Sequence, residues 1–154
     1  IMVDGDVTVS LQQCHFRENH ADYGGGIKLH QGTAHVEGCT FSNNHARHEG
    51  GAVYVSPTGP LKSLQIRDSC FFYITSDTCT GGIYLGNKVD AYSYVTHSHL
   101  AGNQGVGLDY AGRVHFDARE NAWHGIGGPG GIGEGDGDLV YGKVDYIPHR
   151  DSEF

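Results

Sequence analysis

Three aspartates and two arginines in the second half of the chain have side chains suited to sugar chemistry. A glycosidase needs two carboxyl groups that face one glycosidic bond. A lyase needs a basic group, usually helped by Ca²⁺, to take the proton next to a carboxylate. The candidates, if they share one face of a sheet, are Asp109, Asp117, Asp145, Arg113 and Arg119. Most charged surface residues only interact with water, so these five do not by themselves define an active site.

Eleven histidines make metal binding a second candidate chemistry. The pairs that could share an ion are His20 with His45, His30 with His35, and His97 with His99. Imidazole nitrogens ligate Zn²⁺ and related metals, but no carboxylate or cysteine completes an obvious ligand set beside any pair. We therefore expect outward-facing histidines. Their titration near neutral pH would make the surface charge sensitive to pH.

A glycine-rich segment near the C-terminus offers oxygen ligands for calcium. Residues 130–134, Gly-Gly-Ile-Gly-Glu, nearly reproduce the GGxGxD pattern of RTX repeats, but Gly135 stands where that pattern has Asp. The available carboxylates are those of Glu134, Asp136 and Asp138, and Ca²⁺ prefers such ligands. The pattern occurs once rather than in tandem, so a turn without metal is the default interpretation and Ca²⁺ is the alternative. No other cofactor is predicted.

An internal repeat indicates the elements that position these residues. Residues 9–32 are written a second time at 34–57. Cys, Phe, Asn and Gly return at one offset: 39 − 14 = 25, 41 − 16 = 25, 44 − 19 = 25 and 50 − 25 = 25. A period of about 20–50 residues is typical of stacked units that complete each other's core.

Each repeat contains short alternations of apolar and polar residues separated by Gly and Asn, such as Val9-Ser10-Leu11. This pattern predicts short strands joined by turns. A coil of about 25 residues with three such strands is the unit of a parallel β-helix, in which each strand pairs with its equivalent one turn further on. We expect an all-β solenoid of about five coils over residues 1–124. Residues 125–154 would form an irregular Gly-rich loop and a C-terminal capping segment of the same domain.

Side chains that recur between coils are expected to stack along the interior. An aromatic column, interrupted by Leu100, would consist of Phe16, Phe41, Phe71 and Phe116. A ladder of amides at the corners of the coils would consist of Asn19, Asn44, Asn103 and Asn121.

The four cysteines form no Cys-x-x-Cys pair, which argues against a zinc knuckle. Cys14 and Cys39 would stack at the strand spacing of about 4.8 Å. A disulfide accepts that separation, although two thiols in a ladder are equally consistent with it. Cys70 and Cys79 fall within one repeat and could close a short loop. A secreted setting would favour both disulfides.

Two motifs carry a resemblance to a known family. Residues 16–19 and 41–44 match FxxN, residues 50–53 match GGA[ILV], and residues 25–27 are a near match to it. These paired motifs resemble the repeats of chlamydial polymorphic outer-membrane proteins and of pectate-lyase-like β-helix surface proteins more widely. Residues 121–148 resemble the closing segment of secreted bacterial β-helix proteins, except that Ala122 and His149 stand where that segment has Trp. The resemblance implies a right-handed β-helix located outside the cell or at its surface.

Function is less constrained, because adhesins, structural proteins and enzymes share this fold. Pectin hydrolases of the fold carry Asn-Thr-Asp, Asp-Asp, Gly-His-Gly and Arg-Ile-Lys motifs, and the epimerases carry Asp-Pro-His; the sequence has none of these. The nearest string is His124-Gly125. We therefore predict an extracellular structural or adhesive module without enzymatic activity. The alternative is a carbohydrate-binding or polysaccharide-processing β-helix, similar to a lyase or hydrolase.

Charge and length constrain the partners. The 154 residues include 18 Asp and Glu against 10 Lys and Arg, for a formal charge of −8. Such acidity argues against nucleic acid and anionic membranes, and no apolar run has the length of a membrane span. Surface glycans remain a candidate.

The chain opens in strand-like alternation at Ile1-Met2-Val3, so we expect a fragment or a processed product. Its first coil would then need a cover, either an adjoining domain or another copy. If the Val3–Leu11 stretch met the Val140–Tyr146 segment of the next copy, the contact would be head to tail and would build a filament.

Overall fold

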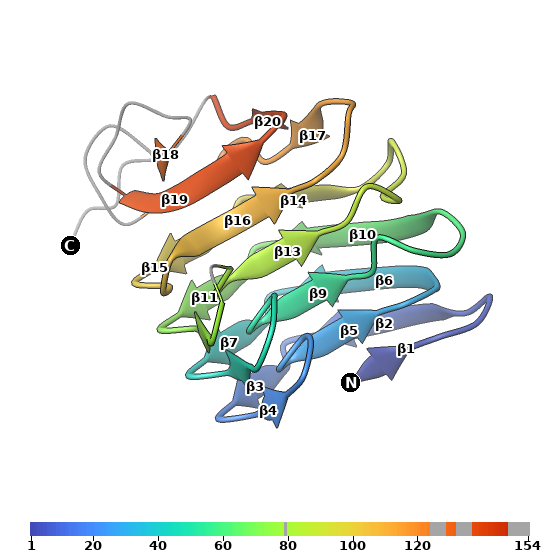
Figure 1. Cartoon of the computed structure of the whole chain (residues 1–154), viewed down its shortest axis with the longest axis horizontal. Coiled ribbons are helices and arrows are strands. Elements are labelled where there is room, and N and C mark those ends of the chain that lie inside the picture. The colour runs from blue at the N-terminus through green and yellow to red at the C-terminus, as the bar shows by residue number, and fades with distance from the viewer. Residues whose placement is uncertain (79, 124–128, 132–136, 148–154) are drawn as a thin grey trace.

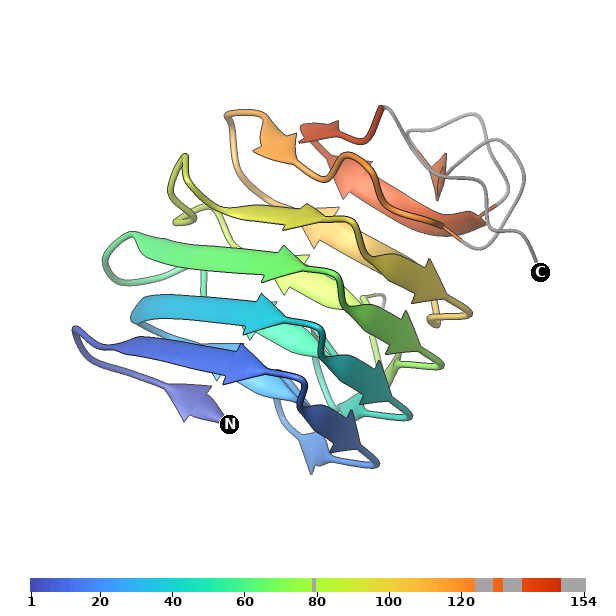
Figure 2. The ribbon, with the colours of Figure 1, turned by 180° about the vertical axis from the view of Figure 1, so that it is seen from behind.

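The computed structural model describes residues 1–78, 80–123, 129–131 and 137–147, and the regular elements in these ranges are all strands. Figures 1 and 2 show the chain winding into a stack of coils, with the N-terminal strands at one end and the C-terminal strands at the other. Every pairing between two named strands is parallel, and each strand pairs with its equivalent in the next coil. The chain is therefore a parallel β-helix, as predicted.

Four sheets run along the stack, and we name them A to D. Sheet A contains β1 (Met2–Val3), β5 (Ile27–Leu29), β9 (Val53–Val55), β13 (Ile83–Leu85), β16 (Val106–Tyr110), β19 (Gly137–Gly142) and β18 (Pro129–Gly131). Sheet B contains β2 (Thr8–Gln12), β6 (Gly32–Glu37), β10 (Lys62–Arg67), β14 (Tyr94–Thr96), β17 (Phe116–Asp117) and β20 (Val144–Asp145). Sheet C contains β3 (His15–Arg17), β7 (Thr40–Ser42), β11 (Cys70–Phe72) and β15 (His99–Ala101). Sheet D contains β4 (His20–Ala21), β8 (His45–Ala46) and β12 (Thr75–Ser76).

The described chain makes about four turns rather than five, because sheet C has four strands. The repeat length also changes along the stack. Ile27 pairs with Val53, one residue beyond the 25-residue offset (53 − 27 = 26), because Ala52 is an additional residue before β9. Ala34 pairs with Leu64, and this offset is 30 residues (64 − 34 = 30) because the 56–61 loop is longer than its counterpart in the first coil. Loops on the outside of the coils absorb these insertions, so the strands keep their register.

A column of side chains on sheet C forms the centre of the core. The ring of Phe41 lies between those of Phe16 and Phe71, with centroid distances of 4.6 and 4.7 Å and interplanar angles of 5° and 8°. Leu100 pairs with Phe71 in the next coil. The bridge from His99 to Ala122 brings the fully buried Trp123 beside Leu100 at the C-terminal end of the column. Stacked rings are favourable because aromatic pairs contribute beyond their buried area.

Phe116 does not belong to this column, which corrects the prediction. It lies on β17 in sheet B, where it pairs with Val144, and its ring contacts Tyr110 at 5.3 Å. Phe116 is nevertheless buried, with 2% of its surface exposed. The last position of the column belongs to Trp123, which the sequence analysis did not assign to it.

The coils turn corners at residues with positive φ, and the residue that follows is Cys, Ser or Asn except after Tyr73, where Ile74 follows. At the corner between sheets B and C the positive-φ residues are Gln13, Gly38, Asp68, His97 and Glu120. At the corner between sheets C and D they are Glu18, Asn43, Tyr73 and Gly102. A left-handed residue reverses the chain sharply and leaves backbone groups that the next side chain can bind.

The amide ladder at the corner between sheets C and D follows this rule. The Oδ1 atom of Asn44 accepts hydrogen bonds from the backbone and side-chain nitrogens of Asn19 at 3.1 and 2.9 Å, and its Nδ2 atom donates to the Phe16 carbonyl at 2.8 Å. Asn103 repeats the arrangement with the backbone nitrogen of Ile74 and the carbonyl of Phe71, both at 3.1 Å. Ile74 stands at the equivalent position in the intervening coil, so an apolar side chain interrupts the ladder.

Asn121 belongs to the other corner, between sheets B and C, which corrects its predicted place. There each residue donates its backbone N–H to the side chain one coil further on. The four steps are Cys14 to Cys39 Sγ (3.4 Å), Cys39 to Ser69 Oγ (3.1 Å), Ser69 to Ser98 Oγ (3.2 Å) and Ser98 to Asn121 Oδ1 (2.8 Å). Cysteine, serine and asparagine therefore serve one structural purpose along this ladder.

Candidate functional site

The outward side chains of sheet B form a polar row that crosses the coils. Successive side chains of a strand point to opposite faces, so equivalent outward positions line up. Register places these residues in one row: Ser10, His35, Gln65, Tyr94, Asp117 and Asp145. A parallel row two residues along each strand contains Glu37, Arg67 and Thr96. The solenoid therefore displays polar, aromatic and charged groups at the regular spacing of its strands.

Three adjoining hollows lie over these rows. The largest, of about 410 Å³, is lined by Tyr94, Thr96, His97, Asp117, Arg119 and Glu120. A hollow of about 210 Å³ shares Tyr94 with it and extends over His35, Glu37, Gln65 and Arg67. Another, of about 290 Å³, shares Arg119 and extends over Val144, Asp145, Tyr146 and Ile147. We call this surface, from His35 to Tyr146, the sheet B groove.

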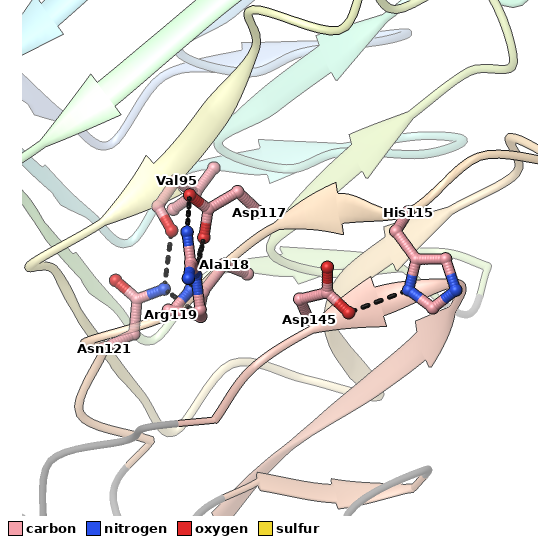
Figure 3. Close-up of polar contacts among 7 residues, drawn as sticks. All are labelled: Val95, His115, Asp117, Ala118, Arg119, Asn121 and Asp145. Atoms are coloured by element: carbon pink, nitrogen blue, oxygen red, sulfur yellow. Dashed lines mark hydrogen bonds and ion pairs between the residues drawn. The ribbon is translucent and has the colours of Figure 1, made fainter.

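The charges in the groove are paired with one another. Arg119 donates to both carboxylate oxygens of Asp117, from Nε at 2.9 Å and from Nη2 at 3.0 Å. The side-chain hydrogen bonds from Arg119 hold the pKa of Asp117 below its ordinary value, although desolvation acts in the opposite direction. Asp145, on the neighbouring strand, lies 2.7 Å from Nδ1 of His115. Figure 3 shows these two pairs, with Asn121 beside the first of them.

This pairing is unfavourable for acid catalysis. Glycoside hydrolysis needs one carboxyl that stays protonated, with a raised pKa, to donate to the leaving oxygen. Asp117 has the opposite shift. The other sequence candidates lie elsewhere: Asp109 is on sheet A, and Arg113 lines a separate hollow with Tyr92 and Val114. The structure therefore brings together Asp117, Asp145 and Arg119 and separates Asp109 and Arg113 from them.

The described histidines have exposed or half-buried side chains. His20 and His45 are adjacent in sheet D, with ring centroids 5.5 Å apart. His45 contacts the Thr75 hydroxyl at 2.9 Å and Asp77 at 3.4 Å. Within the described ranges, no group of three or more His, Cys, Asp or Glu residues is arranged to hold a metal ion.

Cys14, Cys39 and Cys70 are free thiols in this structure. Cys14 and Cys39 stand one above the other as part of the corner ladder, so the thiol arrangement is found rather than the disulfide. Cys70 lies one residue beyond the ladder, because Ser69 takes the position of Cys39 in its coil. Cys79 lies outside the described residues, and so does any Cys70–Cys79 bond.

Asp138, a predicted calcium ligand, has a role in the fold. Its Oδ2 atom accepts hydrogen bonds from the side-chain nitrogen of Asn103 at 2.5 Å and from its backbone nitrogen at 3.2 Å, and Oδ1 accepts from the Gly102 backbone at 3.0 Å. Asp138 thus takes the next position of the amide ladder. Glu134 and Asp136, the other two predicted ligands, lie outside the described residues.

Gln65 and Tyr94 were not singled out from the sequence, and His35 was considered only as a metal ligand paired with His30. These three groove residues come from coils whose repeat lengths differ, so a fixed offset of 25 does not align them. The signal that could have found them is the corner ladder, because Cys39, Ser69 and Ser98 mark equivalent positions in these coils. Counting back from each marker would have aligned the outward residues of sheet B.

The fold and its repeated corners define a solenoid of the parallel β-helix class. Residues 38–56 match the family model of the Chlamydia polymorphic membrane protein repeat. The matched segment contains the FxxN motif at 41–44 and the GGAV motif at 50–53. The chain is thus a β-helix with repeats of this type, and the match favours an outer-membrane or cell-surface location. No curated protein and no solved structure matches the chain.

A search for membrane-spanning helices among the described residues found none that is long and apolar enough.

Proposed function

We propose that this chain is an adhesive module, exposed at the cell surface or outside the cell, that binds glycans through the sheet B groove. The observation that carries the proposal is the continuity of the groove: three hollows share lining residues across the strands from β6 to β20. Four strand intervals of about 4.8 Å give the row from His35 to Asp145 a length of about 19 Å. An extended polymer lying across the strands is the ligand that suits such a shape.

The groove has the groups that a sugar chain needs. Tyr94, half-buried at the middle of the row, offers an aromatic surface for the apolar face of a sugar ring. Polar side chains on both sides of it can donate to and accept from hydroxyl groups. His35 and Gln65 already bind each other at 2.9 Å, and Arg119 holds Asp117, so these groups are ordered before a ligand arrives. Such order lowers the entropic cost of binding.

The same pairing supports binding without catalysis. Asp117 and Asp145 are adjacent in register, but each lies beside a basic side chain. The pKa of Asp117 is lowered by its hydrogen bonds from Arg119, so Asp117 is a good hydrogen-bond acceptor and a poor proton donor. We therefore expect the groove to retain its ligand unchanged.

Binding to an array of neutral and acidic oligosaccharides tests the proposal. We expect saturable binding to at least one glycan class, with a loss of tenfold or more on Tyr94→Ala and on Arg119→Met. Tyr73→Ala is the matched control, because Tyr73 is 66% exposed and lies at the corner between sheets C and D. Incubation with the bound glycan should release neither reducing ends nor unsaturated products. An array without any binding, or binding that Tyr94→Ala leaves unchanged, contradicts the adhesive role, and released product restores the enzyme alternative.

A second candidate function is end-to-end assembly, supported by the strands at the ends of the sheets. β1, β2, β3 and β4 are all terminal strands, and β20 is the opposite terminal strand of sheet B. An exposed sheet edge favours pairing with another strand. Val140 is not at such an edge, because β19 pairs with both β16 and β18. The predicted contact therefore narrows to β2 of one copy against β20 of the next.

Sedimentation velocity from about 1 μM to about 1 mM protein tests this assembly, because weak contacts have dissociation constants in that range. We expect the sedimentation coefficient to rise with concentration. The backbone N–H of Gln13 donates to the Glu37 carbonyl, on the side of β2 that faces β6. Successive N–H groups of a strand point to opposite sides, so the N–H of Ser10 points away from β6, toward the open edge. Ser10→Pro should remove that donor and keep the chain monomeric with an unchanged melting temperature. A wild-type chain that stays monomeric throughout the range contradicts assembly.

A further inference from the structure

The outer face of sheet A carries a second row, distinct from the groove on sheet B. Register places these residues next to one another in successive coils: Lys28, Tyr54, Tyr84, Asp109 and Tyr141. The rings of Tyr54 and Tyr84 are stacked, with centroids 5.3 Å apart and an interplanar angle of 12°. Aromatic side chains thus follow the strand spacing on this face, as the phenylalanines do inside the coil.

The stack changes at Asp109, whose side chain is short. Tyr84 and Tyr141 stand on either side of it, separated by two strand intervals, or about 9.6 Å. A single planar group placed between them would continue the stack at the spacing seen between Tyr54 and Tyr84. The three residues therefore define a slot with two aromatic sides and a carboxylate floor.

The carboxylates at this slot form no ion pair among the described residues. Asp109 accepts a hydrogen bond from the Thr80 hydroxyl at 3.3 Å, and no described ion pair includes Asp109 or Glu49. Burial raises the pKa of both carboxyls, and the charge of Asp109 adds to the shift at Glu49, whereas His48 acts in the opposite direction on Glu49. Asp109 and Glu49 therefore lie close enough to repel each other. The net charge here is negative and partly shielded from water, which favours a cationic ligand.

Tyr54, which precedes Tyr84 in the row, lies beside the same carboxylates. Only 8% of its surface is exposed. Burial, followed by the charge of Glu49, raises the pKa of Tyr54 to about 12, so its side chain stays neutral.

We propose that the slot formed by Tyr84, Asp109 and Tyr141 binds the guanidinium group of an arginine side chain from a protein partner. Guanidinium is planar, so it fits between two rings, and its fork of donors matches a carboxylate. The same face already holds a cation on an aromatic ring, because the Lys28 ammonium lies 5.2 Å from the centroid of Tyr23. Cation–π attraction is strongest where water is partly excluded, as it is over Tyr54 and Tyr84. The slot differs from the glycan groove in ligand and in location.

Titration with three short peptides tests the proposal. The peptides carry arginine, lysine or citrulline at the central position and are otherwise uncharged. We expect saturable calorimetric binding of the arginine peptide, at least fivefold weaker binding of the lysine peptide and none of the citrulline peptide. Asp109→Asn and Tyr84→Leu should each weaken arginine binding at least tenfold. Asp68→Asn is the matched control, because it removes the same charge at an exposed corner where Asn also tolerates the positive φ of 51°. Equal binding of lysine and arginine, or no effect of Asp109→Asn, overturns the proposal.

Thermal stability gives a measurement that does not depend on finding the partner. The folded pKa of Asp109 lies above its unfolded value, so the folded state binds this proton more tightly, and stability falls as pH rises from the unfolded value through the folded one. Asp109→Asn should therefore melt at a higher temperature than the wild type at neutral pH. The difference should shrink in acid, where Asp109 is protonated. A lower melting temperature at neutral pH would show that the carboxylate stabilises the fold rather than serving a ligand.

Discussion

Phe41→Ala should reduce the free energy of unfolding by about 3–5 kcal/mol, the range measured for deleting a buried phenyl ring. Phe41 has no exposed surface and lies between two parallel rings, each less than 5 Å away. Its removal leaves a cavity in the middle of the column, and neither neighbour can move to fill it. Each neighbour is held in place by the pairing of its strand with β7. We therefore expect the full loss of stability that an unfilled cavity causes.

Urea denaturation followed by circular dichroism measures this loss. Tyr73→Ala is the control, because Tyr73 is an aromatic residue at the corner between sheets C and D with 66% of its surface exposed. This substitution should change the free energy of unfolding by no more than about 0.5 kcal/mol. A loss below about 1 kcal/mol for Phe41→Ala would mean that the column is not the core of the repeat.

The fold could be predicted because two consecutive coils are nearly identical in length. Cys14, Phe16 and Asn19 recur at one offset, and strand register keeps that offset through sheets B, C and D. Later coils were harder to align because insertions in the loops shift every later number. Phe71, for example, follows Phe41 by 30 residues rather than 25 (71 − 41 = 30).

Two assignments failed because residue type was followed instead of corner position. Asn121 was grouped with Asn103, but its side chain accepts from Ser98, a residue of the other corner. The two corners need the same hydrogen-bond acceptor, so Asn suits both, and residue type cannot tell them apart. Phe116 was grouped with Phe71 for a similar reason, since inward positions of sheets B and C are both apolar.

The candidate sites could be predicted only in part. The sequence offered Asp117, Asp145 and Arg119, together with Asp109 and Arg113, as candidates for sugar chemistry if they shared one face. It could not show that Arg119 neutralises Asp117, which depends on a turn after β17 that brings Arg119 back over its own strand. The sequence also could not show that Asp109 lies on a different sheet from Asp117, although Asp109 precedes Asp117 by only eight residues (117 − 109 = 8).

Gly51→Ala should destabilise the chain by about 3 kcal/mol or more, because overpacking against backbone cannot be relieved by side-chain movement. A Cβ atom at Gly51 would lie 2.3 Å from the Thr75 carbonyl oxygen and 2.5 Å from that of Gly81, both in the next coil. These contacts show that Gly51 allows the close approach of two successive coils. Gly25 and Gly81 are equally tight against their neighbours, at 2.4 Å and 2.3 Å.

Gly38→Ala is the control that introduces backbone strain without the close contact between coils. Gly38 has a φ of 61°, but a Cβ atom there would come no closer than 3.6 Å to its neighbours. The left-handed conformation alone costs an alanine about 1–2 kcal/mol, so Gly38→Ala should lose less than Gly51→Ala in the same denaturant melts. A loss at Gly51 no larger than the loss at Gly38 would contradict the overpacking explanation, because Gly51 is not among the glycines with positive φ. A larger loss at Gly51 means that the repeat needs glycine wherever one coil's corner rests on the next, which accounts for its return at a fixed offset.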